Sequence, residues 1–328
     1  MESSLYGSDE GFYLRRMPRE DFYTAPELHP AFARVLSREV FRRLDAVART
    51  FPEGPLSVLE IGSGDGTLAE QISTCLQQQD ERPEWIRRLR YILVERVEEV
   101  LKKSLERLSG TKIRILGYSD IRSVKPIRGV ILSNELFDAL PVHLLEKRDG
   151  AFHEVYVDAD GGAELGPLSR PELAEAARGV EPGLPEGGRH AVSLDALQCL
   201  RDLGGVLEAG WIFTVDYGRR MAAGAANPPR AFRRHTTDSD VLASPGRRDI
   251  TASVDFSSLM REGERCGLGT ESYGTLAAFL LERGILDFLP AGDDAAAFAE
   301  RLKVKTLFHP DGMGEAFKVL VQRKGLPA

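Results

Sequence analysis

The 328-residue chain is long enough for two domains or for one decorated core. Hydrophobic residues make up 42% and charged residues 28%, which supplies apolar material for a core and excludes wholesale disorder. Because 50 acidic residues outnumber 43 basic ones and give a net charge of -7, the sequence offers no general basic surface for nucleic acid.

The cysteines and the lack of long apolar stretches indicate the cellular environment. Cys75, Cys199 and Cys266 stand too far apart for a CxxC metal site or a disulfide framework, so we expect buried thiols, a reducing compartment and no metal. No stretch approaches the ~20 apolar residues of a membrane span, and the N-terminus lacks the apolar core of a signal peptide. We expect a cytoplasmic protein without a membrane span.

The first half of the chain has the pattern of alternating helices and strands. Apolar residues at three- and four-residue steps predict an amphipathic helix within 18–50, behind Pro26 and Pro30. A short apolar run at 56–61 predicts a strand, which turns through a glycine cluster into a helix at 67–77. The sequence therefore predicts strand, tight loop and helix in succession.

Further near-continuous aliphatic runs predict more strands. Runs without polar alternation are buried on both faces, which is typical of a parallel sheet between two layers of helices. Helical spacing separates several of them, as at 97–108 and 194–203. The runs are residues 91–95, 112–116, 129–134, 211–218 and 317–323.

Four segments lie outside this repeating pattern. Residues 142–162 predict a hairpin, because period-two patterning surrounds the turn Asp149-Gly150. Residues 163–190 are rich in Gly, Pro and Glu and predict a surface excursion, and 219–250 predict a second long loop. Residues 276–308 predict a helical insertion before the last strand.

The glycine cluster after the first strand carries the sharpest motif, E-I-G-S-G-D-G-T at 60–67. A dinucleotide fingerprint requires G-x-G-x-x-G, but Thr67 stands where the third glycine of this pattern is required. The next acidic strand end, Glu95, also lies beyond the ~20-residue offset of that motif. Both observations weaken an NAD interpretation, and an ordinary turn remains the other alternative.

The same residues look like motif I of class I S-adenosylmethionine-dependent methyltransferases, whose cationic sulfonium tolerates an acidic strand end. In that interpretation Glu95 accepts the ribose hydroxyls and Asp120 lies near the adenine. Alternatively, Glu95 begins a solvated helix, and the loop residue Asp65 satisfies backbone donors. The expected cofactor-binding residues are Glu60, Gly62, Ser63, Gly64, Gly66, Glu95, Asp120 and Asn134.

Two carboxylates follow the fourth strand, at the sheet edge that faces the glycine loop. We expect Glu135, Asp138 and Asn134 to be catalytic, although Asp138 could instead cap a turn and Glu135 could be solvent exposed. His235 could reach the same crevice or pack within its loop. The expected substrate-side residues are Tyr23, Thr24, Asp216 and His235.

Seven sequence blocks, in their order along nearly the whole chain, resemble the MidA-like family of class I methyltransferases. That family includes a mitochondrial complex I assembly factor that acts as a protein arginine methyltransferase. The blocks are D-F-Y-T-A-P-E (21–27), E-I-G-S-G-D-G-T-L (60–68), S-N-E-L-F-D-A-L-P (133–141), V-D-Y-G (215–218), R-R-H (233–235), G-R-R-D-I-T-A-S-V-D-F (246–256) and M-G-E-A-F-K-V-L (313–320).

The resemblance implies an α/β fold with a doubly wound, mostly parallel seven-stranded sheet, an antiparallel final hairpin strand, and hairpin and helical insertions. It divides the chain into a substrate-side or cap segment (1–50), a methyltransferase core (51–141 and 191–328) and an inserted hairpin and loop (142–190). The lack of an Arg-rich amphipathic transit peptide indicates a cytoplasmic member of bacterial type.

The resemblance also implies S-adenosylmethionine as cofactor and methylation of arginine in a partner protein, without metal. Carboxylates that pin a guanidinium would help, so Glu135 would orient the acceptor, with Asp138 beside it and Asp216 behind. Asn134 would lie beside the methionine part of the cofactor. Two other hypotheses remain open: a methyltransferase that acts on a small metabolite, and a non-catalytic assembly factor that binds S-adenosylmethionine.

Overall fold

The computed structural model describes residues 1–7, 11–12, 24–78, 83–158, 160–180, 183–222, 225–233, 236–238, 240–242 and 246–327. They form two compact units, each of which is described by itself. The core unit consists of Tyr23–Leu136, Leu200–Tyr217 and Met260–Ala328, and the insert unit of Met1–Phe22, Phe137–Cys199 and Gly218–Leu259. Among the described residues, no helix is long and apolar enough to cross a membrane.

The core unit is built on a sheet whose main path runs in the order β14-β15-β9-β4-β1-β2-β3. Strands β9, β4, β1, β2 and β3 pair in parallel, whereas β15 runs antiparallel to both β9 and β14. This confirms the predicted α/β fold with a mostly parallel sheet and an antiparallel final strand; besides the seven strands of the main path, the short β13 (Val254–Asp255) pairs in parallel with β9. The strands are β1 (Leu56–Ile61), β2 (Leu89–Val94), β3 (Arg114–Tyr118), β4 (Ile127–Asn134), β9 (Leu207–Arg219), β14 (Gly269–Thr275) and β15 (Phe317–Lys324).

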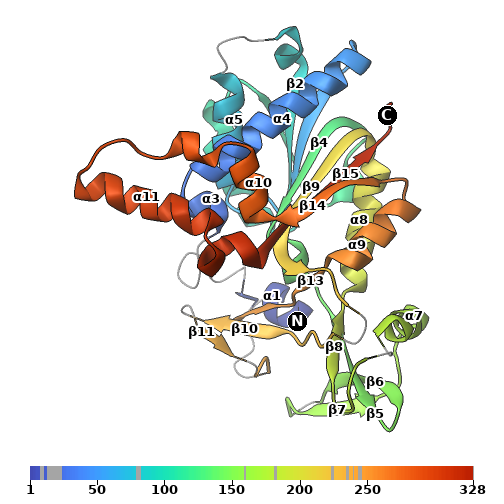
Figure 1. Ribbon diagram of the computed structural model, residues 1–328. Helices are drawn as coiled ribbons and strands as arrows, with labels where there is room; N and C mark the ends of the chain where they lie inside the picture. The colour runs from blue at the N-terminus through green and yellow to red at the C-terminus, as the bar shows by residue number, and fades with distance from the viewer. Residues whose placement is uncertain are drawn as a thin grey trace. The chain divides into compact units, whose positions relative to one another are not determined.

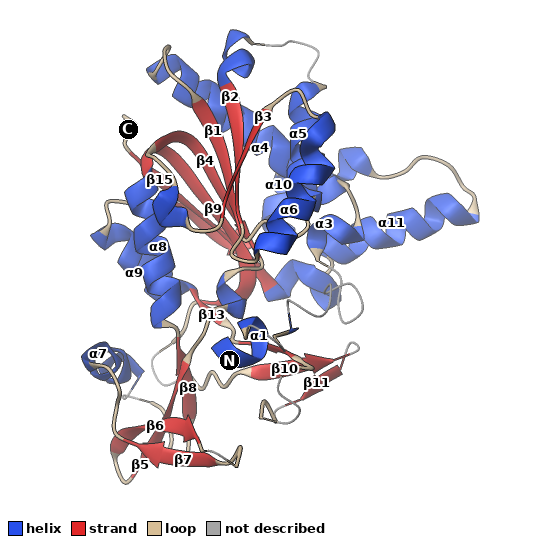
Figure 2. Cartoon of the chain, turned by 180° about the vertical axis from the view of Figure 1, so that it is seen from behind, coloured by secondary structure: helices blue, strands red, loops and turns tan. Residues whose placement is uncertain are grey.

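Helices cover both faces of this sheet, as Figures 1 and 2 show: α4, α5 and α10 lie against one face and α8 and α9 against the other. Two of these helices, α8 and α9, are joined by an ion pair between Arg201 and Glu262, 2.8 Å apart. The helices are α3 (Ala25–Leu28), α4 (Ala31–Thr50), α5 (Thr67–Gln77), α6 (Glu98–Arg107), α8 (Leu194–Val206), α9 (Phe256–Arg265), α10 (Leu276–Glu282) and α11 (Ala295–Phe308).

Burial explains why the aliphatic runs became strands. All six residues of β1 are buried, and alternate residues pack into different layers. Val58 packs with Leu36 and Leu44 of α4 in one apolar cluster, whereas Leu59 is equally buried but lies outside that cluster. A strand that is apolar on both faces is stable only between two layers of helices, as the sequence pattern predicts.

The insert unit contains the predicted hairpin of β5 (His143–Arg148) and β6 (Ala151–Val157). Asp149 and Gly150 at its turn both have positive φ, 53° and 73°, as a two-residue hairpin turn requires. Strands β7 (Ala163–Gly166) and β8 (Arg189–Val192) extend the hairpin to four strands.

Residues 163–190 differ from the predicted surface excursion, because they also contain the helix α7 (Pro171–Val180). Leu173 and Ala177 of α7 are buried against Leu145 and Val192. The sequence did not predict α7, because its few apolar residues stand among Gly, Pro and Glu and give only a weak helical periodicity. The loop expected at 219–250 likewise contains a small sheet, with the strands β10 (Arg230–Arg233), β11 (Thr236–Asp238) and β12 (Asp249–Thr251) in the order β11-β10-β12.

The close pairing of β4 with β9 gives a test of the core sheet. Gly129 and Gly210 are register partners, and a Cβ on Gly210 would lie 1.8 Å from the main-chain oxygen of Gly129. We expect Gly210→Ala to lower the free energy of unfolding by about 2–4 kcal/mol, because the strands must separate to admit the methyl group.

Gly205→Ala is the matched control. Gly205 lies in α8 with nothing within 4 Å of an added Cβ, so we expect no loss and a gain of up to about 1 kcal/mol from helix propensity. Urea denaturation followed by circular dichroism measures both variants. Equal midpoints for Gly210→Ala and the parent protein would contradict the close approach of the two strands.

Candidate functional site

A glycine loop joins β1 to α5 at the carboxyl edge of the parallel strands. Gly62, Gly64 and Gly66 have φ values of 67°, 50° and 79°, a region that side chains with a Cβ rarely occupy. A Cβ on Gly62 would lie 2.9 Å from Leu136 Cδ1, but one on Gly64 meets no atom within 4 Å. The backbone at Gly64 is therefore open to close approach by a ligand.

Glu95, directly after β2, holds this loop in place. Its Oε2 accepts a hydrogen bond from the Gly64 N–H at 3.1 Å, and its Oε1 accepts one from the Val97 N–H at 3.0 Å. Burial raises the pKa of Glu95, although these main-chain donors oppose the shift. Carboxylate oxygens with further lone pairs thus lie beside the open glycine loop.

Asp65, within the loop, faces the helix and the neighbouring layer. Its Oδ1 accepts hydrogen bonds from the N–H and the hydroxyl of Thr67, at 3.0 and 2.7 Å, and its Oδ2 pairs with Arg107 at 2.9 Å. These bonds satisfy donors at the start of α5, so the structure favours the backbone-satisfying interpretation of Asp65.

Glu60 belongs to β1, and its side chain is buried at 3% exposure. The Tyr91 hydroxyl on β2 donates to its Oε2 at 2.5 Å. Burial raises the pKa of Glu60 to about 8, the charge of Asp65 adds to the shift, and the bond from Tyr91 opposes it. One oxygen of the Glu60 carboxyl group is therefore hydrogen-bonded in the interior of the core unit and not at its surface.

The end of β4 presents Asn134 and Glu135. Glu135 has a φ of 52°, which is uncommon for a residue with a side chain and is concentrated at functional sites. Its Oε1 accepts hydrogen bonds from the Ala25 N–H at 3.2 Å and from Asn134 Nδ2 at 3.1 Å. The backbone strain therefore aims this carboxyl group at the N-terminal helix α3.

Electrostatics at Glu135 are set by its acidic neighbours. Burial raises its pKa to about 8, the two hydrogen bonds lower it, and the charges of Asp216 and Glu27 raise it further. Asp216 is fully buried on β9, and its Oδ2 accepts a hydrogen bond from the Leu136 N–H at 3.1 Å. A cation at this place would relieve the repulsion among the three carboxyl groups.

Helix α3 is held between the glycine-loop helix and β4. Thr24 is its N-cap residue, and both its N–H and its hydroxyl donate to Glu27 Oε2, at 3.3 and 3.1 Å. Gln71 of α5 donates from Nε2 to the Pro26 carbonyl at 3.1 Å. The N-terminal segment therefore reaches both sides of the candidate site.

Several buried polar atoms along this edge have no hydrogen-bond partner within the described part of the chain. β1 and β4 align so that Ile61 pairs with Ser133, which brings their polar ends to the same edge. Unpaired buried polar groups are costly and usually have a ligand or water as partner. The atoms are Ser63 Oγ, Gln71 Oε1, Ser133 Oγ and Asn134 Oδ1.

These features fit the S-adenosylmethionine that the motif implies. The open backbone at Gly64 admits a close ligand, Glu95 offers acceptors for a diol, and the unpaired atoms offer hydrogen bonds to an amino-acid group. No group of three His, Cys, Asp or Glu side chains that could hold a metal ion occurs in the part of the chain that the structure describes.

Not every expected residue joins this site. Asp120 caps a short turn and pairs with Arg122 at 2.6 Å, which lowers the pKa of Asp120. Asp138 belongs to the insert unit, where its carbonyl accepts a hydrogen bond from the Ala252 N–H at 3.0 Å, and its catalytic role stays a prediction. Tyr23 and His235 lie outside the described residues.

Sequence reasoning missed four contributors: the Ala25 N–H, Glu27, Gln71 and Tyr91. The spacing T-x-x-E from Thr24 to Glu27 is a capping-box pattern and could have identified the helix start. Gln71 and Tyr91 carry no local signal, because each acts on a residue at least 31 positions away.

The buried Glu60 gives a pH test of stability. Its pKa is about 8 in the folded protein against 4.5 for an ordinary glutamate, so between these values the folded state keeps a proton that the unfolded state has released. Stability therefore falls as pH rises from about 4.5 to 8. Glu60→Gln removes this titration, and its free energy of unfolding should rise relative to the parent by about 3 kcal/mol between pH 5 and pH 8.

Urea denaturation at four pH values in this range measures the difference. Tyr91→Phe is the companion variant: it keeps Glu60 but removes the hydrogen bond that lowers its pKa, so the loss of stability should continue above pH 8. A constant difference between Glu60→Gln and the parent across the range would refute the buried titration.

Comparison with known proteins identifies the family. The family described as "Putative S-adenosyl-L-methionine-dependent methyltransferase" matches residues 35–274. The chain is 26% identical to the human mitochondrial protein arginine methyltransferase NDUFAF7, over 97% of this chain and 77% of that protein. It is also 26% identical to the Drosophila melanogaster homologue, over 100% of this chain and 81% of that protein.

Solved structures agree with this assignment. A crystal structure of a protein from Burkholderia thailandensis, bound to S-adenosyl-homocysteine, is 28% identical to this chain, with a TM-score of 0.83. The match covers 100% of this chain and 87% of that one. A native structure from the same organism is 29% identical, with the same TM-score and 100% and 86% coverage. The chain therefore belongs to this family of S-adenosylmethionine-dependent methyltransferases and uses S-adenosylmethionine as its cofactor.

Proposed function

We propose that this methyltransferase methylates an arginine side chain of a partner protein. The observation that carries the proposal is the grouping of Glu135 with Asp216 and Glu27 beside the glycine loop, where burial and the charges of Asp216 and Glu27 raise the pKa of Glu135 to about 8. A guanidinium remains protonated because its pKa exceeds 12, and it forms paired hydrogen bonds with carboxylates. The relatives named protein arginine methyltransferases support the same acceptor.

The cofactor-side part of the proposal assigns residues to the two ends of S-adenosylmethionine. Glu95 accepts hydrogen bonds from the ribose hydroxyls, and Asn134 and Ser63 offer unpaired polar atoms to the methionine part. Gly62, Gly64 and Gly66 keep the loop close to the cofactor, and Glu60, which accepts a hydrogen bond from Tyr91, lies near the strand end beneath it. The adenine-side role of Asp120 stays a prediction from the sequence, because its carboxylate is paired with Arg122 in the structure.

On the acceptor side, Glu135 orients the guanidinium and Asp216 fixes the backbone behind it at Leu136. The cofactor supplies an electrophilic methyl group on a sulfonium. Because Glu135 has a pKa of about 8, its carboxylate can also take up the proton that the methylated nitrogen releases. Thr24 contributes by capping α3, whose first N–H holds Glu135 in place. The cytoplasmic location remains a prediction from the sequence.

The cofactor assignment is tested by filling the glycine loop. Gly64→Arg places a side chain into open space, so the fold should persist while calorimetric binding of S-adenosylmethionine is lost. Gly54→Arg is the matched control, because Gly54 also has a positive φ and nothing within 4 Å but lies before β1. Titration with NAD should give no heat with any of the proteins. Equal affinity of both Arg variants for S-adenosylmethionine would remove the loop from the cofactor site.

The acceptor assignment is tested with peptides that carry a single arginine and with copies in which lysine replaces it. Transfer of tritium from labelled S-adenosylmethionine should occur on arginine only. We expect kcat/KM to rise with pH and level off above about 8, because the ionised form of Glu135 binds the cation. Glu135→Gln should lower kcat/KM by about 10²-fold and flatten the profile.

Glu53→Gln is the control, since Glu53 is an exposed glutamate before β1. Full arginine transfer by Glu135→Gln, with normal cofactor binding, would overturn the role of Glu135. Transfer to metabolites but to no peptide would favour the small-molecule hypothesis. Cofactor binding without transfer to any acceptor would favour the assembly-factor hypothesis.

A further inference from the structure

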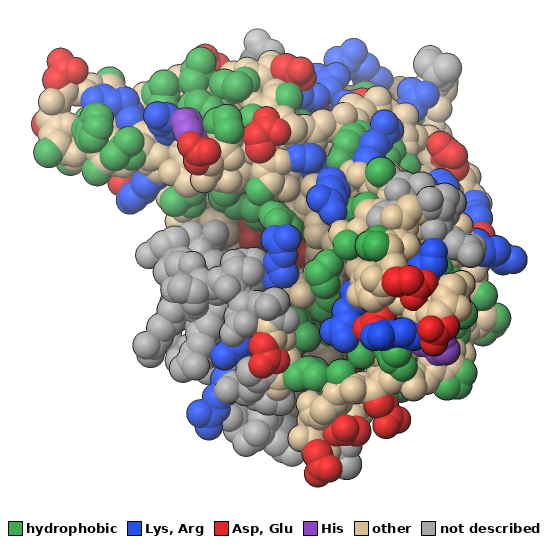
Figure 3. All heavy atoms as spheres, turned by 60° about the horizontal axis from the view of Figure 1, so that its bottom comes forward, with side chains coloured by type: hydrophobic (Ala, Val, Ile, Leu, Met, Phe, Trp, Pro, Cys, Tyr) green, Lys and Arg blue, Asp and Glu red, His purple; other side chains and the backbone are tan. Residues whose placement is uncertain are grey.

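Among the described residues of the core unit, the exposed large apolar side chains lie in the helical insertion. We call residues 276–308 the arm, which comprises α10, a short helical turn at Ile285–Phe288 and α11. Phe298 and Leu302 of α11 are 57% and 47% exposed. Figure 3 shows hydrophobic side chains on the surface of the arm, at the upper left, beside acidic and basic ones. The other exposed large apolar residues of the arm are Leu281, Leu286 and Leu289.

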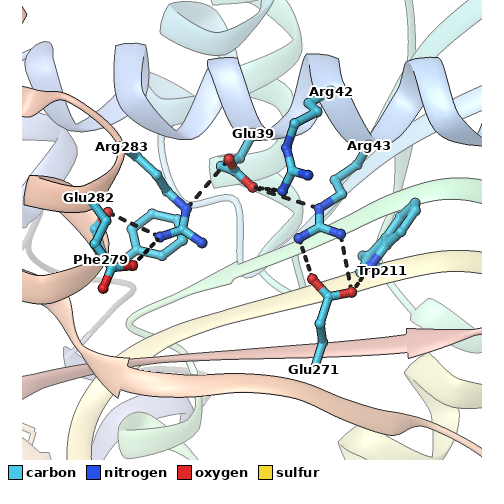
Figure 4. Close-up of polar contacts among 8 residues, drawn as sticks. All are labelled: Glu39, Arg42, Arg43, Trp211, Glu271, Phe279, Glu282 and Arg283. Atoms are coloured by element: carbon cyan, nitrogen blue, oxygen red, sulfur yellow. Dashed lines mark hydrogen bonds and ion pairs between the residues drawn. The ribbon is translucent and has the colours of Figure 1, made fainter.

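The root of the arm is tied to α4 and the sheet by a polar network, which Figure 4 shows in close-up. Arg283 lies 3.5 Å from Glu39 of α4 and stacks over Phe279 at 4.2 Å. Arg43, one turn further along α4, forms two hydrogen bonds with Glu271 of β14. Such paired, partly buried contacts hold the root in one orientation.

The middle and the end of the arm are also fixed. Arg38 of α4 pairs with Asp287 at 2.7 Å, and Arg301 of α11 donates to the Pro290 carbonyl at 3.1 Å. Val304 and Leu307, in the C-terminal half of α11, are fully buried. The N-terminal half of α11 is therefore a preformed helix that extends from an anchored base, as Figures 1 and 2 also show.

The exposed face of α11 has the spacing of a helix-pairing seam. Ala295, Phe298, Ala299 and Leu302 follow one another at steps of three, one and three residues, which places them on one side of the helix, away from Val304. Large and small residues alternate along this face, as in helices whose side chains interdigitate with a neighbour.

The charges at the two ends of the seam are of opposite sign. Asp293 and Asp294 precede the first residue of α11, whereas Lys305 lies near its last turn, and all three are exposed. A copy of the same helix in reverse direction would bring acidic residues against Lys305 at both ends. The face is therefore complementary to itself in the antiparallel orientation.

We propose that two copies of this chain associate through the exposed face of α11, as an antiparallel helix pair around a twofold axis near Ala299. In this register Phe298 packs against the partner's Leu302, and Asp293 and Asp294 face the partner's Lys305. A single helix pair buries less than the roughly 1,200 Å² of a standard interface. The dimer is consequently weak, with a dissociation constant on the order of 10–100 μM.

Charge exchange tests the orientation. Asp293→Lys and Lys305→Asp each place like charges at both ends of the pair, so each should weaken self-association at least tenfold in sedimentation equilibrium. An equimolar mixture of the two variants restores opposite charges at both ends and should associate about as well as the parent protein. Asp293 is chosen because Asp294 caps α11 through the Ala297 N–H. Asp160→Lys and Lys112→Asp, at exposed positions outside the arm, should leave association unchanged.

A cysteine scan tests the register. Ala299→Cys lies at the proposed axis and should form a disulfide-linked dimer under mild oxidation, whereas Ala295→Cys should not, because its neighbour in the partner is close to Lys305. Phe298→Asp should abolish association without affecting cofactor binding. A parent protein that stays monomeric at 200 μM, a mixture of the charge variants that fails to associate, or association that survives Phe298→Asp would each overturn the proposal.

Discussion

The burial of carboxyl groups at the carboxyl edge of the parallel sheet is the constraint on which the site depends. A carboxylate removed from water costs several kcal/mol unless donors replace its hydration. In this protein the donors come from distant segments, so each carboxyl group also fixes the segment that serves it. The pairs are Glu60 with the Tyr91 hydroxyl, Glu95 with the Gly64 N–H, Glu135 with the Ala25 N–H and Asp216 with the Leu136 N–H.

These donors do not fully compensate for the burial of the carboxyl groups. The uncompensated cost of ionising them is relevant to function. The pKa values of Glu60 and Glu135 both stand at about 8, so each carboxyl group ionises at a cost in the folded protein. A positively charged ligand near Glu135 would offset that cost, because it favours the ionised form. The family's cofactor is itself a cation, and the proposed acceptor is another. The burial of these carboxyl groups lowers the stability of the free protein. A bound cation offsets this cost, so the same free energy contributes to the binding of the cation.

Local sequence patterns were sufficient to predict the strand, loop and helix on the cofactor side. The long-range contacts of the site could not be predicted from such patterns. The strand, glycine loop and helix at 56–77 agree with the sequence because each depends on neighbouring residues. β14 escaped prediction because its residues are polar or exposed and it pairs only at the sheet edge with β15. The hydrogen bond from Ala25 to Glu135 spans 110 residues, and no spacing rule connects them. The sequence therefore predicted the acidic side chains of the site, but it did not predict the groups that donate hydrogen bonds to them.

Helix α3 shows how the chain maintains such a site. A four-residue helix is not stable by itself, since nucleation costs more than one turn returns. It persists here because Thr24 and Glu27 cap it and because tertiary contacts hold both ends. Glu135 accepts from its first N–H, and His29, just after its end, lies 3.5 Å from Glu300 of α11. The helix that positions Glu135 is therefore supported from β4 on one side and from the arm on the other, and the geometry of the acidic site depends on both.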